Sequence, residues 1–148
     1  MKRFVYTITL FLIALISTTL SAANPADWKT YFKNDTVKIE YAYQVCDFSS
    51  TASQELVIFK FTNLSSQKIL LSYKANIWNN DICINCEQKS EESRYTIQVL
   101  SNETIITKCD NDWKKFAIFS AFITNNKEAK RYNSLTKFEL TEINIRHE

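Results

Sequence analysis

The chain has 148 residues, of which 45% are hydrophobic and 23% charged, and its formal net charge is +2. It contains no glycine, which excludes the glycine-rich loops that bind phosphate groups, and the nearly neutral charge gives no support to a basic face for nucleic acid. A chain of this length forms one ordinary domain with its own hydrophobic core.

The first 23 residues have the pattern of a secretory signal peptide. A basic start (Lys2–Arg3) precedes an apolar stretch (residues 4–20) and the small residues of a cleavage site (21–23). We therefore predict one mature domain, residues 24–148, that is periplasmic or extracellular. No cysteine directly follows the apolar stretch to carry a lipid, so we expect no stable membrane anchor after cleavage. Loss of two basic residues would leave 18 − 2 = 16 against 16 acidic ones.

Seven segments of the mature chain have the apolar pattern of β-strands. Alternation is clearest in "VKIEYAYQV", where Val37, Ile39, Tyr41, Tyr43 and Val45 share one face. The predicted strands cover residues 36–45, 55–63, 68–78, 94–100, 104–108, 115–124 and 135–145, and the fourth and fifth form a hairpin around "SNE". We see no long amphipathic helix. The sequence thus predicts an all-β fold, an immunoglobulin-like antiparallel β-sandwich of about seven strands.

Asparagine and aspartate replace glycine at the predicted turns. Both residue types tolerate left-handed backbone, because their short polar side chains bond to nearby backbone groups. They cluster between the strands, at residues 34–35, 79–81, 110–112 and 125–126.

The order of features resembles a group of small exported bacterial β-sandwich proteins. The features are Trp28, "VKIEYAY" before Cys46, "NDICINC" after Trp78, and Cys109 before "FAIFSAF". The resemblance implies the fold and the location. It implies no activity and no catalytic residue, because that group has no agreed activity.

The four cysteines are Cys46, Cys83, Cys86 and Cys109. If successive strands alternate in direction, all four follow strands that run the same way and should gather at one end of the sandwich. Four thiols there permit a zinc site, a redox dithiol or two disulfides. Export to an oxidising compartment favours disulfides.

The other two uses of the cysteines have weaker support. A Cys₄ zinc site more often contains a second Cys-x-x-Cys pair, and no helix is expected after Cys86 to lower a thiol pKa. The nearby acids Asp81 and Glu87 would raise such a pKa. Of the three possible pairings we favour Cys83 with Cys86 and Cys46 with Cys109.

Catalytic chemistry is hard to assemble from this sequence. The only histidine, His147, is the penultimate residue, and a general base must be held firmly within reach of its target. We therefore expect a protein that is not an enzyme and needs no cofactor or metal. Three N-x-[ST] triplets begin at Asn34, Asn63 and Asn102, and an asparagine-rich sequence produces these by chance.

Aromatic and acidic residues beside the cysteines form a possible binding surface. They are Trp78, Asp81, Asp110, Asp112 and Trp113. The alternative is that each tryptophan packs in the core beside a disulfide, which is the more common arrangement. The sequence predicts a non-catalytic exported module that binds an unknown envelope protein or a glycan. The alternative is a thiol-redox or metal-binding protein that uses the four cysteines.

Overall fold

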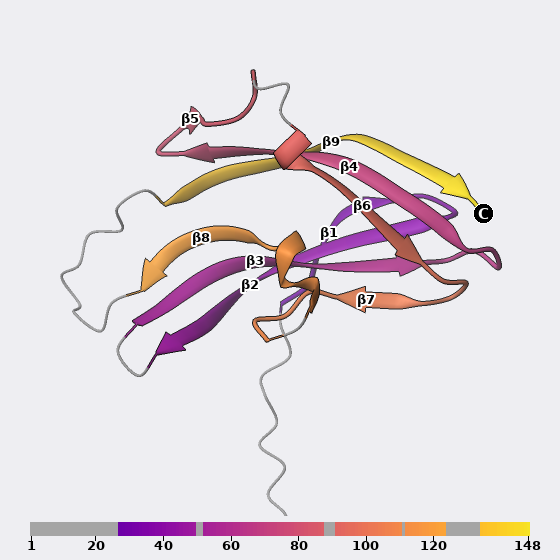
Figure 1. Ribbon diagram of the computed structural model, residues 1–148, viewed down its shortest axis with the longest axis horizontal. Helices are drawn as coiled ribbons and strands as arrows, with labels where there is room; N and C mark the ends of the chain where they lie inside the picture. Colours follow the sequence, from indigo (N-terminus) through magenta and orange to yellow (C-terminus); the bar gives the residue numbers. More distant parts are fainter. Residues whose placement is uncertain (1–26, 50–51, 88–90, 111, 124–133) are drawn as a thin grey trace, which may run out of the picture.

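The computed structural model describes residues 27–49, 52–87, 91–110, 112–123 and 134–148. The predicted signal peptide, residues 1–23, lies outside the described residues. Within them, two antiparallel sheets form a sandwich (Figure 1). The strands are β1 (Lys29–Lys33), β2 (Val37–Ser49), β3 (Ala52–Asn63), β4 (Ile69–Asn79), β5 (Ile82–Cys83), β6 (Arg94–Val99), β7 (Thr104–Ile106), β8 (Ile118–Ile123) and β9 (Leu135–His147).

Strands β3 and β4 are the centres of the two sheets. In the first sheet, β1, β2 and β3 are neighbours in chain order, and both β7 and β8 pair with the other edge of β3. In the second sheet, β4 pairs with β9 and also with β6 and β5. The chain crosses between the sheets after β3, β6 and β8. The all-β, antiparallel sandwich prediction is therefore confirmed.

All seven predicted strands are present, but the predicted hairpin between residues 94–100 and 104–108 is wrong. Strand β6 pairs with β4 in the second sheet, whereas β7 pairs with β3 in the first. The strand expected to begin at residue 115 begins at Ile118, because Asp112–Phe116 form a short 3-10 helix, η3. A second such helix, η2 (Glu91–Ser93), precedes β6. The short strands β1 and β5 were not predicted.

The main core lies between the two sheets. The inner face of β3 contributes Val57, Phe59 and Phe61, all fully buried. Aromatic rings continue across the core from β1 to η3, with neighbouring ring centroids 5.2 to 6.4 Å apart. These rings belong to Tyr31, Tyr41, Phe138, Phe59, Phe61, Tyr73, Tyr95, Phe116 and Trp113.

The outer face of the first sheet is also partly buried. Leu56 and Ile58 of β3 and Ala42 and Cys46 of β2 form a second apolar cluster there. Trp28, Cys109, Ala117 and Phe119 cover it. Burial changes along the face of β2 that was predicted from alternation: Val37 and Ile39 are buried and Tyr41 packs against the main core, whereas Tyr43 and Val45 are exposed by 49% and 53%.

Asparagine and aspartate do supply left-handed backbone at turns. Asn80 and Asp81 have φ angles of 48° and 65° and form the two-residue turn between β4 and β5. Asn102 has a φ of 56° in the connection from β6 to β7. The fourth residue of this kind, Glu142 (φ 52°), lies in β9 beside a register shift with β4.

Asn63 joins three segments at one end of the sandwich. Its side chain is buried, and its amide nitrogen donates hydrogen bonds to the carbonyls of Gln67, Val99 and Leu100 at 2.7, 3.2 and 2.9 Å. Its amide oxygen accepts a bond from the Ser65 N–H at 2.9 Å. Because every polar atom of this amide is used, the residue fixes the crossings after β3 and β6.

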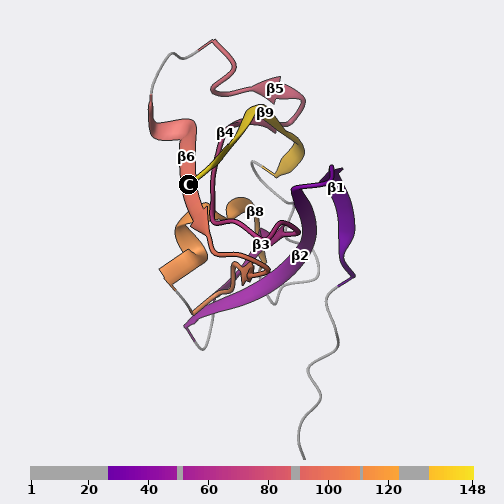
Figure 2. The ribbon, with the colours of Figure 1, turned by 90° about the vertical axis from the view of Figure 1, so that its right-hand side faces the viewer.

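Tyr31 closes one open side of the sandwich. Figure 2 shows β1 turned toward β9 at this side. The Tyr31 hydroxyl accepts a hydrogen bond from the Leu140 N–H at 2.7 Å and lies 3.4 Å from the Leu140 carbonyl oxygen. The Tyr31 side chain is therefore the hydrogen-bond partner of the outward-facing backbone groups of Leu140 in β9.

Glu40 is paired on the outer face of the first sheet. Its carboxylate lies 2.7 Å from the Lys38 Nζ and 2.8 Å from the Lys60 Nζ, and its side chain is only 10% exposed. Burial raises the pKa of Glu40, but the hydrogen bonds and charges of Lys38 and Lys60 outweigh it and hold this pKa below its ordinary value of 4.5. The folded protein therefore favours the charged carboxylate.

We predict that Glu40→Gln lowers the free energy of unfolding at pH 7 by about 1 to 2 kcal/mol. The contribution of a lowered pKa is complete above pH 4.5 and is lost as the pH falls through the folded value, so the difference between wild type and variant should shrink as the pH falls below 4.5. Urea unfolding at pH 7 and at one acidic pH below 4.5 measures this. Glu139→Gln, which breaks the exposed Lys137 pair, is the control and should cost under about 0.5 kcal/mol. An equal loss at both pH values would contradict the prediction.

Candidate functional site

The structure places the predicted binding residues on two different sheets. Trp78 is the penultimate residue of β4 and is half-buried, with the Lys137 Nζ 4.5 Å from its ring centroid. Asp81 follows in the exposed β4–β5 turn, where its N–H donates to the Thr136 Oγ1 at 2.9 Å. These two residues belong to the second sheet.

The other three predicted residues lie in the connection from β7 to β8. Asp110 and Asp112 are exposed, and Trp113 packs against the main core with its ring centroid 5.7 Å from that of Phe116. Trp113 therefore has the core position that the alternative interpretation expected. Figures 1 and 2 both separate this connection from β5, so the five residues form two groups, and their binding role stays a prediction.

The four cysteines form two disulfides, Cys46–Cys109 and Cys83–Cys86, in the pairing that we favoured. As expected, β2, β4 and β7 point toward the same end of the sandwich (Figure 1). The sulfurs nevertheless do not gather in one cluster, because Cys46–Cys109 lies on the outer face of the first sheet and Cys83–Cys86 beside β4 of the second. Among the described residues, no group of three or more His, Cys, Asp or Glu side chains could hold a metal ion.

The Cys46–Cys109 disulfide belongs to the second apolar cluster. Cys46 is 2% exposed and packs with Leu56 and Ile58 of β3, while Cys109 comes from the segment after β7. The bond spans 63 positions of sequence. It therefore holds the β7–β8 connection over the outer face of the first sheet.

The Cys83–Cys86 disulfide lies in a surface loop held onto β4. The loop's Asn85 acts as a backbone substitute: its Oδ1 accepts from the Ile77 N–H and its Nδ2 donates to the Ala75 carbonyl, both at 2.8 Å. The Ile84 N–H donates to the Ile77 carbonyl at 2.9 Å. A groove of about 300 Å³ is lined by Cys83, Ile84, Cys86 and Glu87.

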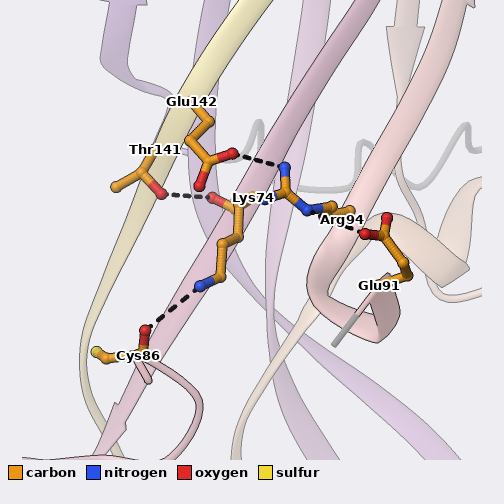
Figure 3. A network of polar contacts seen from close by, with 6 residues as sticks. All are labelled: Lys74, Cys86, Glu91, Arg94, Thr141 and Glu142. Atoms are coloured by element: carbon orange, nitrogen blue, oxygen red, sulfur yellow. Dashed lines mark hydrogen bonds and ion pairs between the residues drawn. The ribbon is translucent and has the colours of Figure 1, made fainter. Parts of the chain in front are cut away.

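Charged side chains surround the place where this loop crosses the second sheet (Figure 3). Lys74, buried on β4, donates from its Nζ to the Cys86 carbonyl at 3.4 Å. Arg94 on β6 bonds Glu142 at 2.6 Å and lies 3.5 Å from Glu91. The hydrogen bond and charge of Glu142 raise the pKa of Arg94.

A groove that the sequence did not indicate lies along β2. Strand β1 pairs with β2 only from Lys38 to Tyr41, and no described strand pairs with β2 beyond that point on this side. A groove of about 650 Å³ lies across the first sheet. It is lined by Trp28, by Tyr43, Gln44 and Val45 of β2, by Ile58 of β3, and by Ile106 and Lys108 at and just after the end of β7. Nothing in the sequence indicated this groove, because the alternating pattern placed Tyr43 and Val45 on the same face as the buried Val37 and Ile39.

Comparison with protein-family models, with curated proteins and with solved structures found no match. The resemblance to exported bacterial β-sandwich proteins therefore stays a prediction. Within the described part of the chain, no helix is long and apolar enough to cross a membrane.

We predict unequal stability losses when the disulfides are removed. On the chain-entropy relation, C46A/C109A should lower the free energy of unfolding by about 4 kcal/mol and C83A/C86A by about 2 kcal/mol. Loss of packing at Cys46 adds to the first value. Urea unfolding of the two double variants measures the difference. Equal losses would show that the buried bridge is not the main covalent restraint.

Proposed function

We propose that this protein is a non-catalytic exported module, a β-sandwich stabilised by two disulfides. In this proposal it binds an extended segment of an envelope protein along the edge of β2 that no described strand covers. The observation that carries the proposal is the edge of β2 from Tyr43 to Asp47, where no strand among the described residues pairs with β2 on this side. Tyr43, Gln44 and Val45 of this stretch also line a groove of about 650 Å³. An open strand edge pairs readily with another extended chain, because its backbone donors and acceptors are in register for a further strand.

The groove supports an apolar partner segment. Tyr43 and Val45 of β2 line the groove, and so does Trp28, which also covers the apolar cluster on the outer face of the first sheet. An added strand would place every second side chain on that outer face.

The edge of β9 is a poorer place for strand addition. Tyr31 already occupies the outward N–H and carbonyl of Leu140 there. Glu142 distorts the same strand with its positive φ and its register shift. Both features hinder a further strand at β9.

An immunoglobulin-like relation agrees with the strand order. In that fold strands A, B and E share one sheet, and strands C and F, with C′ in the variable type, share the other. Strands β2, β3 and β7 match the first set, and β6, β4 and β9 match C′, C and F in pairing. Strand β1 is an addition at the A edge. Within the described residues no strand takes the place of G beside β9.

Export is supported by the covalent chemistry of the chain. Two disulfides and no free cysteine suit an oxidising compartment, and the basic, apolar and small-residue pattern of residues 1–23 suits a cleaved leader. A glycan is the other occupant that the groove admits, because Trp28 could stack on a sugar ring.

A photoreactive residue at Tyr43 tests the binding edge. We expect a defined cross-link to one exported protein from position 43 and none from Leu100, an equally exposed residue elsewhere in the molecule. With that partner purified, Val45→Lys should weaken binding about tenfold, because a lysine blocks an edge, whereas Leu100→Lys should not.

Hydrogen exchange separates the two occupants. An added strand should protect alternate amides between Tyr43 and Asp47, since backbone bonds of a ladder form at every second residue. A bound glycan would leave those amides unprotected. Unchanged exchange together with undiminished binding by Val45→Lys would overturn the proposed edge.

Intact-mass measurement of the exported protein tests the location. We expect a chain that begins at Asn24 and carries no free thiol, because cleavage after Ala23 accompanies transfer to an oxidising compartment. A full-length chain with reduced cysteines, recovered from the cytosol, would contradict the prediction.

A further inference from the structure

The two disulfides differ in how easily a reductant can reach them. Cys46 is buried beneath the β7–β8 connection, and its partner Cys109 is half-buried. Cys83 and Cys86 are only half-buried, and both line a surface groove of about 300 Å³. A thiolate attacks a disulfide sulfur directly, so access decides which bridge exchanges first.

Hydrogen bonds hold the loop around Cys83–Cys86 in place independently of the disulfide. Between the two cysteines, the Ile84 N–H and both ends of the Asn85 amide bond to β4 at 2.8 to 2.9 Å. Before them, the Asp81 N–H is bound by Thr136, and after them the Cys86 carbonyl is bound by Lys74 (Figure 3). Opening the bridge therefore leaves five attachments in place.

An apolar contact surface adjoins the bridge. Ile82 is 70% exposed and Ile84 is 50% exposed, one on each side of Cys83. No other isoleucine among the described residues is exposed, and together these two offer a contact for an apolar partner surface.

We propose that Cys83–Cys86 is a thiol–disulfide exchange site whose substrate is the dithiol of another exported protein, docked on Ile82 and Ile84. The site lies on the second sheet and is independent of the proposed partner edge on β2. A partner thiolate attacks one sulfur, forms a mixed disulfide and releases the other sulfur as a thiolate. The second partner thiol then resolves the mixed disulfide. The partner is oxidised to a disulfide, and Cys83 and Cys86 become two thiols, so two electrons and two protons are transferred.

Native-state reduction tests the exchange site. The oxidised protein is treated with dithiothreitol without denaturant, quenched in acid and alkylated, and the modified cysteines are identified by mass spectrometry. We expect two modified cysteines, Cys83 and Cys86, with an unchanged circular dichroism spectrum, and all four only in denaturant. Failure to reduce this pair, or reduction of all four cysteines together, would overturn the proposal.

Reduced thioredoxin serves as the protein dithiol that tests the docking surface. Ile82→Ser should slow reduction by thioredoxin about tenfold more than it slows reduction by dithiothreitol, because only the protein reductant needs the apolar contact. Leu64→Ser, at an exposed leucine elsewhere, is the control and should change neither rate. Equal slowing of both reductants by Ile82→Ser would overturn the docking surface.

Asn85→Ala tests the hydrogen bonds that hold the loop. Removing the amide should lower the effective concentration of one thiol at the other and shift the equilibrium with dithiothreitol about tenfold toward the dithiol. An unchanged equilibrium constant would show that the hydrogen bonds of Asn85 do not affect the stability of the Cys83–Cys86 disulfide.

Discussion

The burial of β3 on both faces is the constraint on which the rest of the structure depends. Its inner face packs on the second sheet through Val57, Phe59 and Phe61, and its outer face carries Leu56 and Ile58, which also need a cover. The segment from β7 to β8 supplies that cover, and a covalent bond to β2 keeps it in place. A strand of this kind is typical of the centre of a sheet, and here it makes the first sheet a layer with apolar packing on two sides.

The two disulfides differ because they occupy different layers of this arrangement. Cys46–Cys109 is part of an apolar cluster and joins segments far apart in the chain. Cys83–Cys86 joins neighbours in a loop that hydrogen bonds already hold to β4. The first bridge therefore restrains the fold more strongly, and the second adds less restraint but lines a groove at the surface. The groove beside β2 lies on the other sheet, so partner binding and sulfur chemistry need not interfere.

Local sequence predicted the strands but not their partners. Alternation identified seven strands, and β1 and β5 were too short to show it. Residues 94–99 and 104–106 looked like a hairpin, yet each found a longer partner strand in a different sheet. The expected oxidising compartment and the spacing of the cysteines predicted the disulfides. The contacts of Lys74 and Asn85 with the Cys83 loop were not predicted, because they join segments whose proximity no local pattern encodes. The exposed edge of β2 escaped prediction because its alternation continues beyond the part of the strand that the second sheet covers.

The buried amide of Asn63 has a consequence for making this protein in a foreign host. Asn63-Leu64-Ser65 is an acceptor triplet for oligosaccharide transfer in eukaryotic secretion, and that transfer occurs on the unfolded chain. A sugar on Asn63 would replace the donor that binds Gln67, Val99 and Leu100 and could not fit in the closed interior. Yeast or mammalian secretion would thus yield misfolded material. Bacterial production lacks this modification and leaves the Asn63 amide available for its three hydrogen bonds.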